Sequence, residues 1–420
     1  MTIESINRKT NSTQPRAGVY CWAGPGTERM IRLKYPHHKI DLPSLWQSYD
    51  PDQLRQARDK LGVTDAWVSY SWGFSERTEQ EDYAFLRQRL ENFHRLGIQT
   101  HAYVQGTNLV LAEHQDQDYY CRDYRGRLIP YHRGRKLTCP NNPAFKAYIH
   151  RKVALALEEE VDGVFVDNIH FGLFPLMLGK SRSTFFGCHC QYCQKRFKQE
   201  VGLPIPTLFQ LHSEVFQAYV DFRVRSLMAL VRELAAQVHA AGKAFGTNSF
   251  DPRLNSPLFY GTDIAELAQV QDYLLFENHY LPSKKRSNAY LRPLVQTLSK
   301  PVFVVSYKRG IGRERHYSQA DFDAVYSESQ EVGYAPCYKA SEYTTRGVWH
   351  NLRYEQLQPV RRIDSIRLKA ATAVGDVPRL PGGERLSRVV NRIYVPTLDR
   401  YYENKLFRRS LGWLYYSVVR

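Results

Sequence analysis

The sequence lacks the segments that would place it in a membrane or a secretory route. Among its 420 residues there is no apolar run of about 18, the minimum for a transmembrane helix. The first sixteen residues, "MTIESINRKTNSTQPR", are polar and lack the apolar centre of a secretory signal. These two absences favour a cytoplasmic protein.

Signatures of sequence-specific nucleic-acid binding are also missing. We find no zinc-finger, ribonucleoprotein or helix-turn-helix motif, although the net charge is +16. The excess charge is interpreted first as a solvated basic surface. Attraction to an acidic polymer or an anionic membrane is the alternative.

The cysteines do not form a disulfide framework, because there are seven of them and the segment "CHCQYC" (188–193) contains three. Cys188, Cys190 and Cys193 form a C-x-C-x₂-C array that could bind a structural zinc ion if a fourth ligand came from elsewhere. Cys139, Cys121 or His170 could supply that ligand. Buried reduced thiols are the alternative. A closed four-ligand site would leave no position for catalysis, so we expect no cofactor in the reaction itself.

Short β-type runs alternate with helical segments along the chain. The eight runs are 17–23, 65–72, 98–106, 161–168, 242–250, 273–280, 301–308 and 334–343, and the clearest helical segments are 51–61, 80–96, 191–200 and 206–241. Strands that alternate with crossover helices form a parallel sheet, and eight repeats predict an α/β fold closed into a (β/α)₈ TIM barrel. A doubly wound open sheet is the alternative, but "AGPG" (23–26) is too weak for its phosphate loop.

Two connections are longer than a simple barrel needs. About forty residues follow the third strand (106–143), and a Cys-rich segment follows the fourth. Long loops at the C-terminal mouth of a barrel build substrate pockets. We therefore expect a polar leader (1–16), a barrel catalytic domain (17–350) and a basic C-terminal extension (351–420).

The end of the extension, "NKLFRRSLGWLYYSVVR", is typical of a basic, aromatic helix. Such a helix could pack on the outer barrel helices, or it could make peripheral membrane contact with its cations facing anionic lipid.

Two strands end in carboxylates. In "VDGVFVDNIHFG" (161–172) a buried strand leads to Asp167, and "LLF" leads to Glu277. Residues at the C-terminal ends of barrel strands point into the mouth. Two carboxylates on one rim are what glycosidic bond cleavage needs, so they are the catalytic candidates. Asp251 and Glu342 are further acid candidates.

The other predicted rim residues suit a sugar, because aromatic faces stack on pyranose rings and polar groups bind hydroxyls. The predicted substrate-binding residues are Trp22, Tyr70, Trp72, His101, Tyr103, Gln105, Asn168, His170, Asn248, His279, Tyr307 and Lys339. Ordinary core packing is the alternative for each aromatic residue.

The segment "LTCPNNPAFKAYI…EEEVDGVFVDNIHFG…GCHCQYCQKRF" resembles hypothetical glycoside hydrolases with α-amylase-like or β-galactosidase-like barrels. The resemblance is closest over 137–197. It implies that Asp167 is the nucleophile and that the Cys-rich loop binds a structural zinc ion. The position of the acid varies among such families, so Glu277 rests on the order of the strands.

We therefore expect a glycoside hydrolase-like enzyme with a carbohydrate substrate. Two alternatives remain open: a carbohydrate-binding barrel that has lost its chemistry, and a barrel hydrolase of another class. A metal-dependent hydrolase is disfavoured, because the first strand has no H-x-H pair of histidines.

Overall fold

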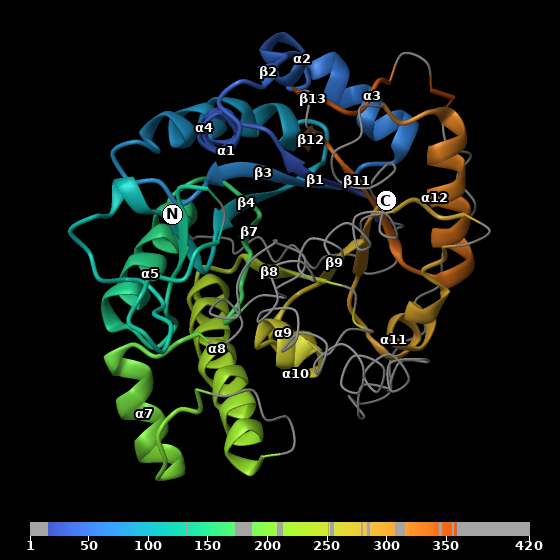
Figure 1. Ribbon diagram of the computed structural model, residues 1–420. Helices are drawn as coiled ribbons and strands as arrows, with labels where there is room; N and C mark the ends of the chain where they lie inside the picture. The colour runs from blue at the N-terminus through green and yellow to red at the C-terminus, as the bar shows by residue number, and fades with distance from the viewer. Residues whose placement is uncertain are drawn as a thin grey trace, which may run out of the picture.

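The computed structural model contains a closed barrel of eight parallel strands (Figure 1). It describes residues 16–131, 133–172, 187–207, 213–250, 252, 256–278, 280–283, 286–306, 316–343, 347–354 and 357–358. Around the barrel the strand order is β1-β11-β10-β9-β8-β7-β4-β3, so each strand lies beside its neighbours in the chain and the last closes on the first. The predicted (β/α)₈ fold is confirmed.

The barrel strands are β1 (Gly18–Trp22), β3 (Asp65–Ser71), β4 (Gln99–Gln105), β7 (Gly163–Asp167), β8 (Ala244–Ser249), β9 (Leu274–Asn278), β10 (Val302–Ser306) and β11 (Ala335–Lys339). Each falls within one of the eight predicted runs. The last run differs in one respect, because it divides after Lys339 and its end forms β12 (Ser341–Tyr343). This strand leaves the barrel to pair antiparallel with β13 (Gly347–His350), which itself pairs with β2 (Lys39–Ile40).

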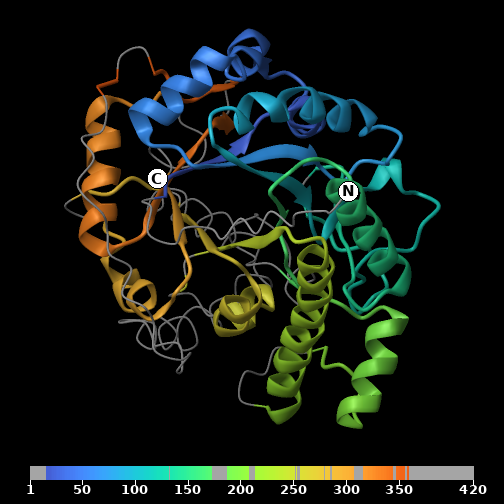
Figure 2. The same cartoon turned by 180° about the vertical axis from the view of Figure 1, so that it is seen from behind.

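Helices surround the strands in both views (Figures 1 and 2). They are α1 (Pro25–Lys34), α2 (Leu42–Gln47), α3 (Pro51–Leu61), α4 (Gln80–His94), α5 (Pro143–Leu157), α7 (Gln191–Val201), α8 (Glu214–Ala240), α9 (Ser256–Tyr260), α10 (Ile264–Val270), α11 (Arg292–Thr297) and α12 (Gln319–Val332). Short 3₁₀ turns lie at Leu111–Glu113 and Ala289–Leu291.

Local sequence accounts for where several helices begin. Asn142 caps α5 by accepting a hydrogen bond from Ala144 N (2.9 Å), and Pro143 follows as the first helical residue. Ser318 and Asp321 form a capping box on α12. These local signals determine where the two helices begin.

The barrel interior is filled by large rings opposite glycines. A Cβ on Gly246 would lie 2.3 Å from the Tyr273 ring, and a Cβ on Gly18 would lie 2.5 Å from Trp67. Trp67 and Tyr273 are fully buried, and Trp67 Nε1 donates to the Tyr273 hydroxyl (2.9 Å). The lower part of the barrel is therefore a packed core, as in other (β/α)₈ proteins.

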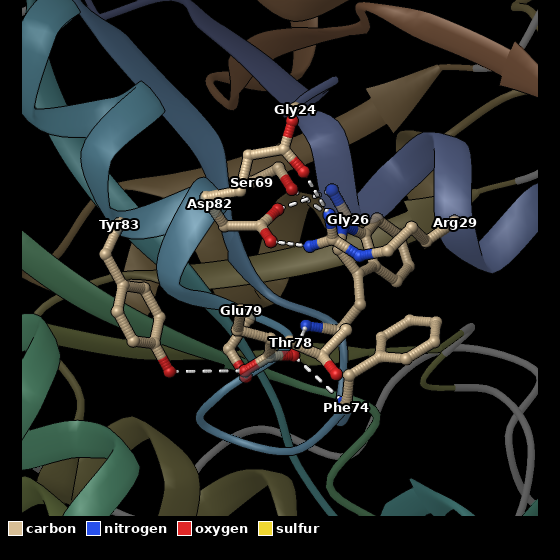
Figure 3. Close-up of polar contacts among 12 residues, drawn as sticks. Gly24, Gly26, Arg29, Ser69, Phe74, Thr78, Glu79, Asp82 and Tyr83 are labelled. Atoms are coloured by element: carbon tan, nitrogen blue, oxygen red, sulfur yellow. Dashed lines mark hydrogen bonds and ion pairs between the residues drawn. The ribbon is translucent and has the colours of Figure 1, made fainter. Parts of the chain in front are cut away.

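Extra elements surround the strand ends that carry the predicted site. The long loop after β4 contains a hairpin of β5 (Asn108–Val110) and β6 (Arg135–Leu137). Two buried carboxylates fix α1 and the loop after β3 (Figure 3). Asp82 pairs with Arg29 and accepts from Gly26 N, and Glu79 accepts from Phe74 N (2.9 Å).

The described part of the predicted C-terminal extension contacts the barrel unit. Leu352, Tyr354 and Leu357 belong to its main hydrophobic cluster, and Lys60 Nζ donates to Tyr354 O (2.5 Å). The predicted basic terminal helix lies outside the described residues. Of the helices the structure describes, none combines the length and apolarity needed to cross a membrane.

Candidate functional site

The two predicted catalytic carboxylates lie together. Asp167 is the last residue of β7 and Glu277 the second-last of β9, and both are buried. The Tyr20 hydroxyl lies 3.1 Å from Asp167 Oδ1 and 2.8 Å from Glu277 Oε1. The nearest oxygens of the pair are therefore within about 6 Å of each other, since one hydroxyl reaches both.

A break in the register of β1 determines which of its side chains reaches this pair. Cys21 has φ +58°, and the pairing with β3 shifts between Val19 and Trp22. Tyr20 points into the barrel towards the carboxylates. Trp22 points outward, where its ring meets Phe93 (centroids 5.3 Å apart) and its Nε1 donates to Ser48 Oγ (2.6 Å).

Asp167 is in an environment that favours its protonated form. Burial is the main cause, and repulsion from Glu277 adds to it, so the pKa of Asp167 rises to about 7. Hydrogen bonds from Tyr103 and Tyr20 oppose this rise without cancelling it. Near neutral pH Asp167 can therefore hold a proton.

Amides on neighbouring strands hold the pair in place. Asn248 Nδ2 donates to Glu277 Oε1 (2.8 Å), and Asn248 Oδ1 accepts from Asn168 N (2.9 Å). Asn168 has φ +54°, a conformation that turns the chain sharply after Asp167, and its side-chain amide donates to Asp167. From the long loop after β4, the Tyr131 hydroxyl donates to Asn168 Oδ1 (2.5 Å).

Several predicted sugar-binding residues belong to the group around the carboxylates. Tyr103 contacts Asp167 directly, and the Trp72 ring packs on Tyr103 (centroids 4.8 Å apart). Gln105 pairs with Asp167 across β4 and β7, and Lys339 pairs with Tyr20 across β11 and β1. Together with Asn168 and Asn248, they form the surroundings of the pair.

Three others lie away from it, and expecting them at the mouth was incorrect in each case for a structural reason. Trp22 is turned outward by the irregularity at Cys21. Tyr70 also faces the helices, where it stacks on Tyr83 (4.4 Å), because neighbouring side chains on a strand alternate between the two faces. His101 faces inward but lies lower in the barrel, with Nε2 3.1 Å from Asp65 Oδ1.

His170 is buried beside Phe250 and Tyr260, with ring centroids 5.3 and 5.6 Å away. Neither of its ring nitrogens has a hydrogen-bond partner among the described residues. Burial lowers the pKa of His170 to about 3, so the ring is neutral. His279, Tyr307 and Asp251 lie outside the described residues, as does the side chain of Glu342.

Sequence reasoning missed Tyr20 and Tyr131. In "GVYCW" the last aromatic residue, Trp22, is the usual choice for a rim residue. Tyr20, two residues earlier, could have been chosen in its place only if the irregularity at Cys21 had been known. Tyr131 lies in an irregular loop that gives no periodic signal.

The cysteine cluster gains its fourth member from the loop after β4. The sulfurs of Cys139, Cys188, Cys190 and Cys193 all lie within 4.8 Å of one another and are buried. A tetrahedral zinc ion with ligands at about 2.3 Å requires sulfurs roughly 3.8 Å apart, so the four residues fit that ion.

Donors around the cluster would stabilise thiolates. Arg122 N and Cys190 N lie 3.3 and 3.2 Å from Cys188 Sγ, and Asn141 Nδ2 lies 3.3 Å from Cys193 Sγ. Of the three candidates for the fourth ligand, the structure brings Cys139 to the group. Cys121 borders the group, in contact with Cys139 and Cys188, and its thiol donates to Thr138 O (3.2 Å), but it is not one of the four whose sulfurs all lie within 4.8 Å of one another.

Comparison with known proteins gives matches of fold. No family model and no curated protein matches the sequence. A β-galactosidase from Rahnella sp. R3 superposes with a TM-score of 0.53 at 15% identity, over 82% of this chain and 52% of that one. The catalytic domain of a β-amylase from Paenibacillus polymyxa gives 0.51 at 11% identity, over 77% and 91%. An α-L-fucosidase from Paenibacillus thiaminolyticus gives 0.50 at 13% identity, over 78% and 46%.

The feature that this chain shares with these structures is the (β/α)₈ barrel. At 11–15% identity the likeness is one of fold. This chain spans about half the length of the β-galactosidase and of the fucosidase.

Proposed function

We propose that the protein is a glycoside hydrolase that uses Asp167 and Glu277 as its carboxyl pair. One observation carries the proposal: a single tyrosine hydroxyl, that of Tyr20, bonds both buried carboxylates. Structural cores rarely place two buried acids together, because like charges repel and burial disfavours ionisation. The glycosidase-type barrel supports the same reading.

The separation of the pair favours retention of anomeric configuration. Carboxyl groups lie about 5–5.5 Å apart in retaining glycosidases and about 6.5–9.5 Å apart in inverting ones, which need room for a water. A pair joined by one hydroxyl matches the shorter range.

The electrostatics of the pair favour particular roles. A general acid must carry a proton at working pH, and the raised pKa of Asp167, about 7, meets that requirement. We therefore assign proton donation to Asp167 and nucleophilic attack at the anomeric carbon to Glu277. This assignment reverses the one implied by the sequence resemblance.

In the first step, Glu277 would form a bond to the anomeric carbon while the bond to the leaving oxygen breaks and that oxygen takes the proton of Asp167. In the second step, Asp167 as a carboxylate would take a proton from water, whose oxygen displaces Glu277. Asn248 bonds Glu277 and would keep its attacking carboxylate in place.

Aryl glycosides with good and poor leaving groups test both the activity and the roles. Asp167→Asn should lower kcat/KM by about three orders of magnitude on a poor leaving group, which needs an acid. On a dinitrophenyl glycoside, whose leaving group needs no acid, Asp167→Asn should slow the first step, formation of the glycosyl-enzyme, only slightly. Glu277→Gln should abolish turnover of both substrates.

Three other results would count against the proposal. If wild type cleaves no member of a broad aryl-glycoside and oligosaccharide panel, the assignment as a hydrolase fails. If Asp167→Asn loses both substrates equally and Glu277→Gln spares the activated one, the roles are exchanged. More than about a tenth of wild-type activity in either variant on poor leaving groups would remove that residue from catalysis.

We also propose that Cys139, Cys188, Cys190 and Cys193 hold one structural zinc ion. Bound there, the ion would tie the loop after β4 to the start of α7. Metal analysis of protein purified without added zinc should give about one equivalent. Cys139→Ser should lower this content, whereas Cys337→Ser, at a buried cysteine on β11, should not. Less than about 0.2 equivalent in wild type would show that the cysteines are ordinary buried thiols.

A further inference from the structure

A pocket of about 440 Å³ lies between the loop after β3, the loop after β4 and helix α5. Its walls include Ser75 from the first loop, Glu113, His114, Asp116 and Tyr119 from the second, and Tyr148 from α5. The residues described around Asp167 and Glu277 do not belong to this lining. The pocket is therefore separate from the carboxylate pair, although both follow the C-terminal ends of barrel strands.

The carboxylate of Glu113 is fixed in the wall of this pocket. Its Oε2 atom accepts hydrogen bonds from Ser75 Oγ (2.5 Å) and Thr78 Oγ1 (2.7 Å). Burial alone would raise the pKa of Glu113, but these bonds lower it below its usual value, so the group is ionised at neutral pH. Within the described part of the chain no donor reaches its other oxygen, Oε1.

His114 provides a second acceptor in the same wall. The residue is only 7% exposed, and its Nε2 atom is buried with no hydrogen-bond partner among the described residues. Burial lowers the pKa of His114, so the ring is neutral near pH 7, and its other nitrogen bonds the backbone of Gly73. A neutral imidazole that donates from one nitrogen accepts at the other. Nε2 is therefore a buried acceptor without a donor.

Cations that border the pocket are already bound by carboxylates of their own. Lys152 lies close enough to affect the pKa of His114, but its Nζ atom pairs with Glu79 (2.7 Å). Arg151 pairs with Glu76, another residue of the pocket wall (3.2 Å). These two cations therefore do not neutralise the other acidic groups of the pocket.

The remaining charges and rings of the pocket suit a positively charged group. In the described part of the chain neither Glu113 nor Asp116 forms an ion pair. The Tyr148 ring lies 5.2 Å from that of His114 and 5.4 Å from that of Tyr119. Aromatic rings attract cations that lie over their faces, and buried acceptors require donors. A ligand with positive charge and N–H donors would meet both requirements.

We propose that this pocket binds a protonated primary amine, with Glu113 Oε1 and His114 Nε2 as its acceptors. An ammonium group has three N–H donors and no acceptor, which matches a wall that lacks donors for these two atoms. A metal ion fits less well. Among the described residues, only the four cysteines bring three or more metal-ligand atoms within 4.8 Å of one another. The proposal does not depend on hydrolysis by the carboxylate pair.

Two pairs of ligands that differ in the amine test this proposal, with the full-length protein and isothermal titration calorimetry at pH 6, where the amines are protonated. Glucosamine tetramer is compared with N-acetylglucosamine tetramer, and diaminobutane with butanediol. We expect the charged member of at least one pair to bind about tenfold more tightly, since one charge-assisted hydrogen bond is worth that factor. Preference for the amine in the sugar pair alone would identify the source as an amino sugar, and preference in the butane pair would identify a free amine.

Variants of the pocket wall locate the amine. Glu113→Gln removes a charge at nearly constant size and should weaken amine binding about tenfold. His114→Asn keeps an N–H donor for Gly73 but removes the Nε2 acceptor, and should weaken binding about fivefold. Neither variant should affect the neutral ligands. Asp116 is exposed, so Asp116→Asn remains informative if the other two variants do not fold, and should weaken binding about threefold.

A matched control removes one negative charge elsewhere. Glu331→Gln, at an exposed carboxylate of α12, should leave amine binding unchanged. Since the net charge of +16 repels cations in general, amine binding that Glu113→Gln weakens and Glu331→Gln spares has a local cause.

Three results would overturn the proposal. The first is equal binding of the charged and the neutral ligand in both pairs, and the second is an equal loss in Glu113→Gln and Glu331→Gln. The third is a loss of amine binding in Asp167→Asn with none in Glu113→Gln, which would place the amine at the carboxylate pair. Failure to cleave any glycoside would contradict the proposed hydrolysis and leave the amine site supported, because binding and cleavage are measured separately.

Discussion

Two aspartates of the same barrel, Asp65 and Asp167, are both buried but have opposite electrostatic surroundings. Asp65 begins β3, where Arg16 Nε donates to Oδ2 (3.0 Å) and His101 Nε2 lies 3.1 Å from Oδ1. Burial alone would raise the pKa of Asp65, but the Arg16 charge and the His101 contact lower it below its usual value. Asp167 ends β7 beside a second carboxylate, and its pKa is raised.

The difference between the two aspartates follows from the ends of the (β/α)₈ barrel at which they lie. Groups at the N-terminal end of the strands serve stability, and groups at the C-terminal end serve chemistry. Asp65 has a cation for its charge. Asp167 has phenol and amide donors but lies beside a second carboxylate, an arrangement that costs stability and that, in the proposed hydrolysis, would prepare a proton for transfer.

The largest expected effect comes from removing the charge of Asp65, at the N-terminal end of the barrel strands. Asp65→Asn leaves the Arg16 guanidinium and His101 facing a neutral amide, so the free energy of unfolding should fall by about 3 kcal/mol at pH 7. Urea unfolding of the two proteins measures it. Asp52→Asn, at an exposed ion pair on α3, is the control and should change stability by less than about 0.5 kcal/mol. A loss no larger than that control would show that the Asp65 network does not stabilise the barrel.

Much of the fold could be predicted because strand and helix periods are local. The runs at 161–168 and 301–308 are short, apolar and β-branched, and the structure has strands within both. The division of 334–343 into β11 and β12 could not be predicted, because it depends on pairing with β13, which lies beyond the run, and β13 in turn pairs with β2, which is distant in sequence. A β-type run in the sequence does not show where a strand changes partner.

The site was only partly predictable for a similar reason. Asp167 and Glu277 stand at strand ends, so order along the chain is enough to bring them to one rim. Tyr20 depends on an irregularity at Cys21 that turns Trp22 outward, and Tyr131 reaches Asn168 from the irregular loop after β4. Single-residue irregularities and loop geometry follow from tertiary packing and leave no periodic trace.

A second prediction tests the comparison of Asp65 with Asp167 through the pH dependence of stability. The folded-state pKa of Asp167, about 7, lies above the unfolded value of about 3.9, so the native state binds the proton more tightly and stability falls as pH rises between these values. Asp167→Asn removes that cost. The variant should be more stable than wild type at pH 8, by about 2–4 kcal/mol, and should show little gain at pH 4.

Urea unfolding at pH 8 and pH 4 measures this difference in the free energy of unfolding. Asp65→Asn should change the free energy of unfolding in the opposite direction. The lowered pKa of Asp65 means that its contribution is present at neutral pH and is lost as pH falls through that value, so its variant should differ most from wild type at pH 8 and least in acid. A destabilised Asp167→Asn at pH 8 would indicate that the carboxylate is ionised and well satisfied in the native protein.

The smallest expected effect concerns the hydroxyl between the two carboxylates. Tyr20→Phe removes a hydrogen bond that lowers the pKa of Asp167, so that pKa should rise further, by roughly half a unit to one unit. If Asp167 donates the proton, the basic limb of the kcat/KM profile moves to higher pH by the same amount. Tyr49→Phe, which removes a buried hydroxyl bonded to Ala23 O, is the matched control and should leave the limb in place. A shift of the acidic limb instead would mean that Asp167 works as a carboxylate, and unchanged limbs would mean that Tyr20 does not tune the pair.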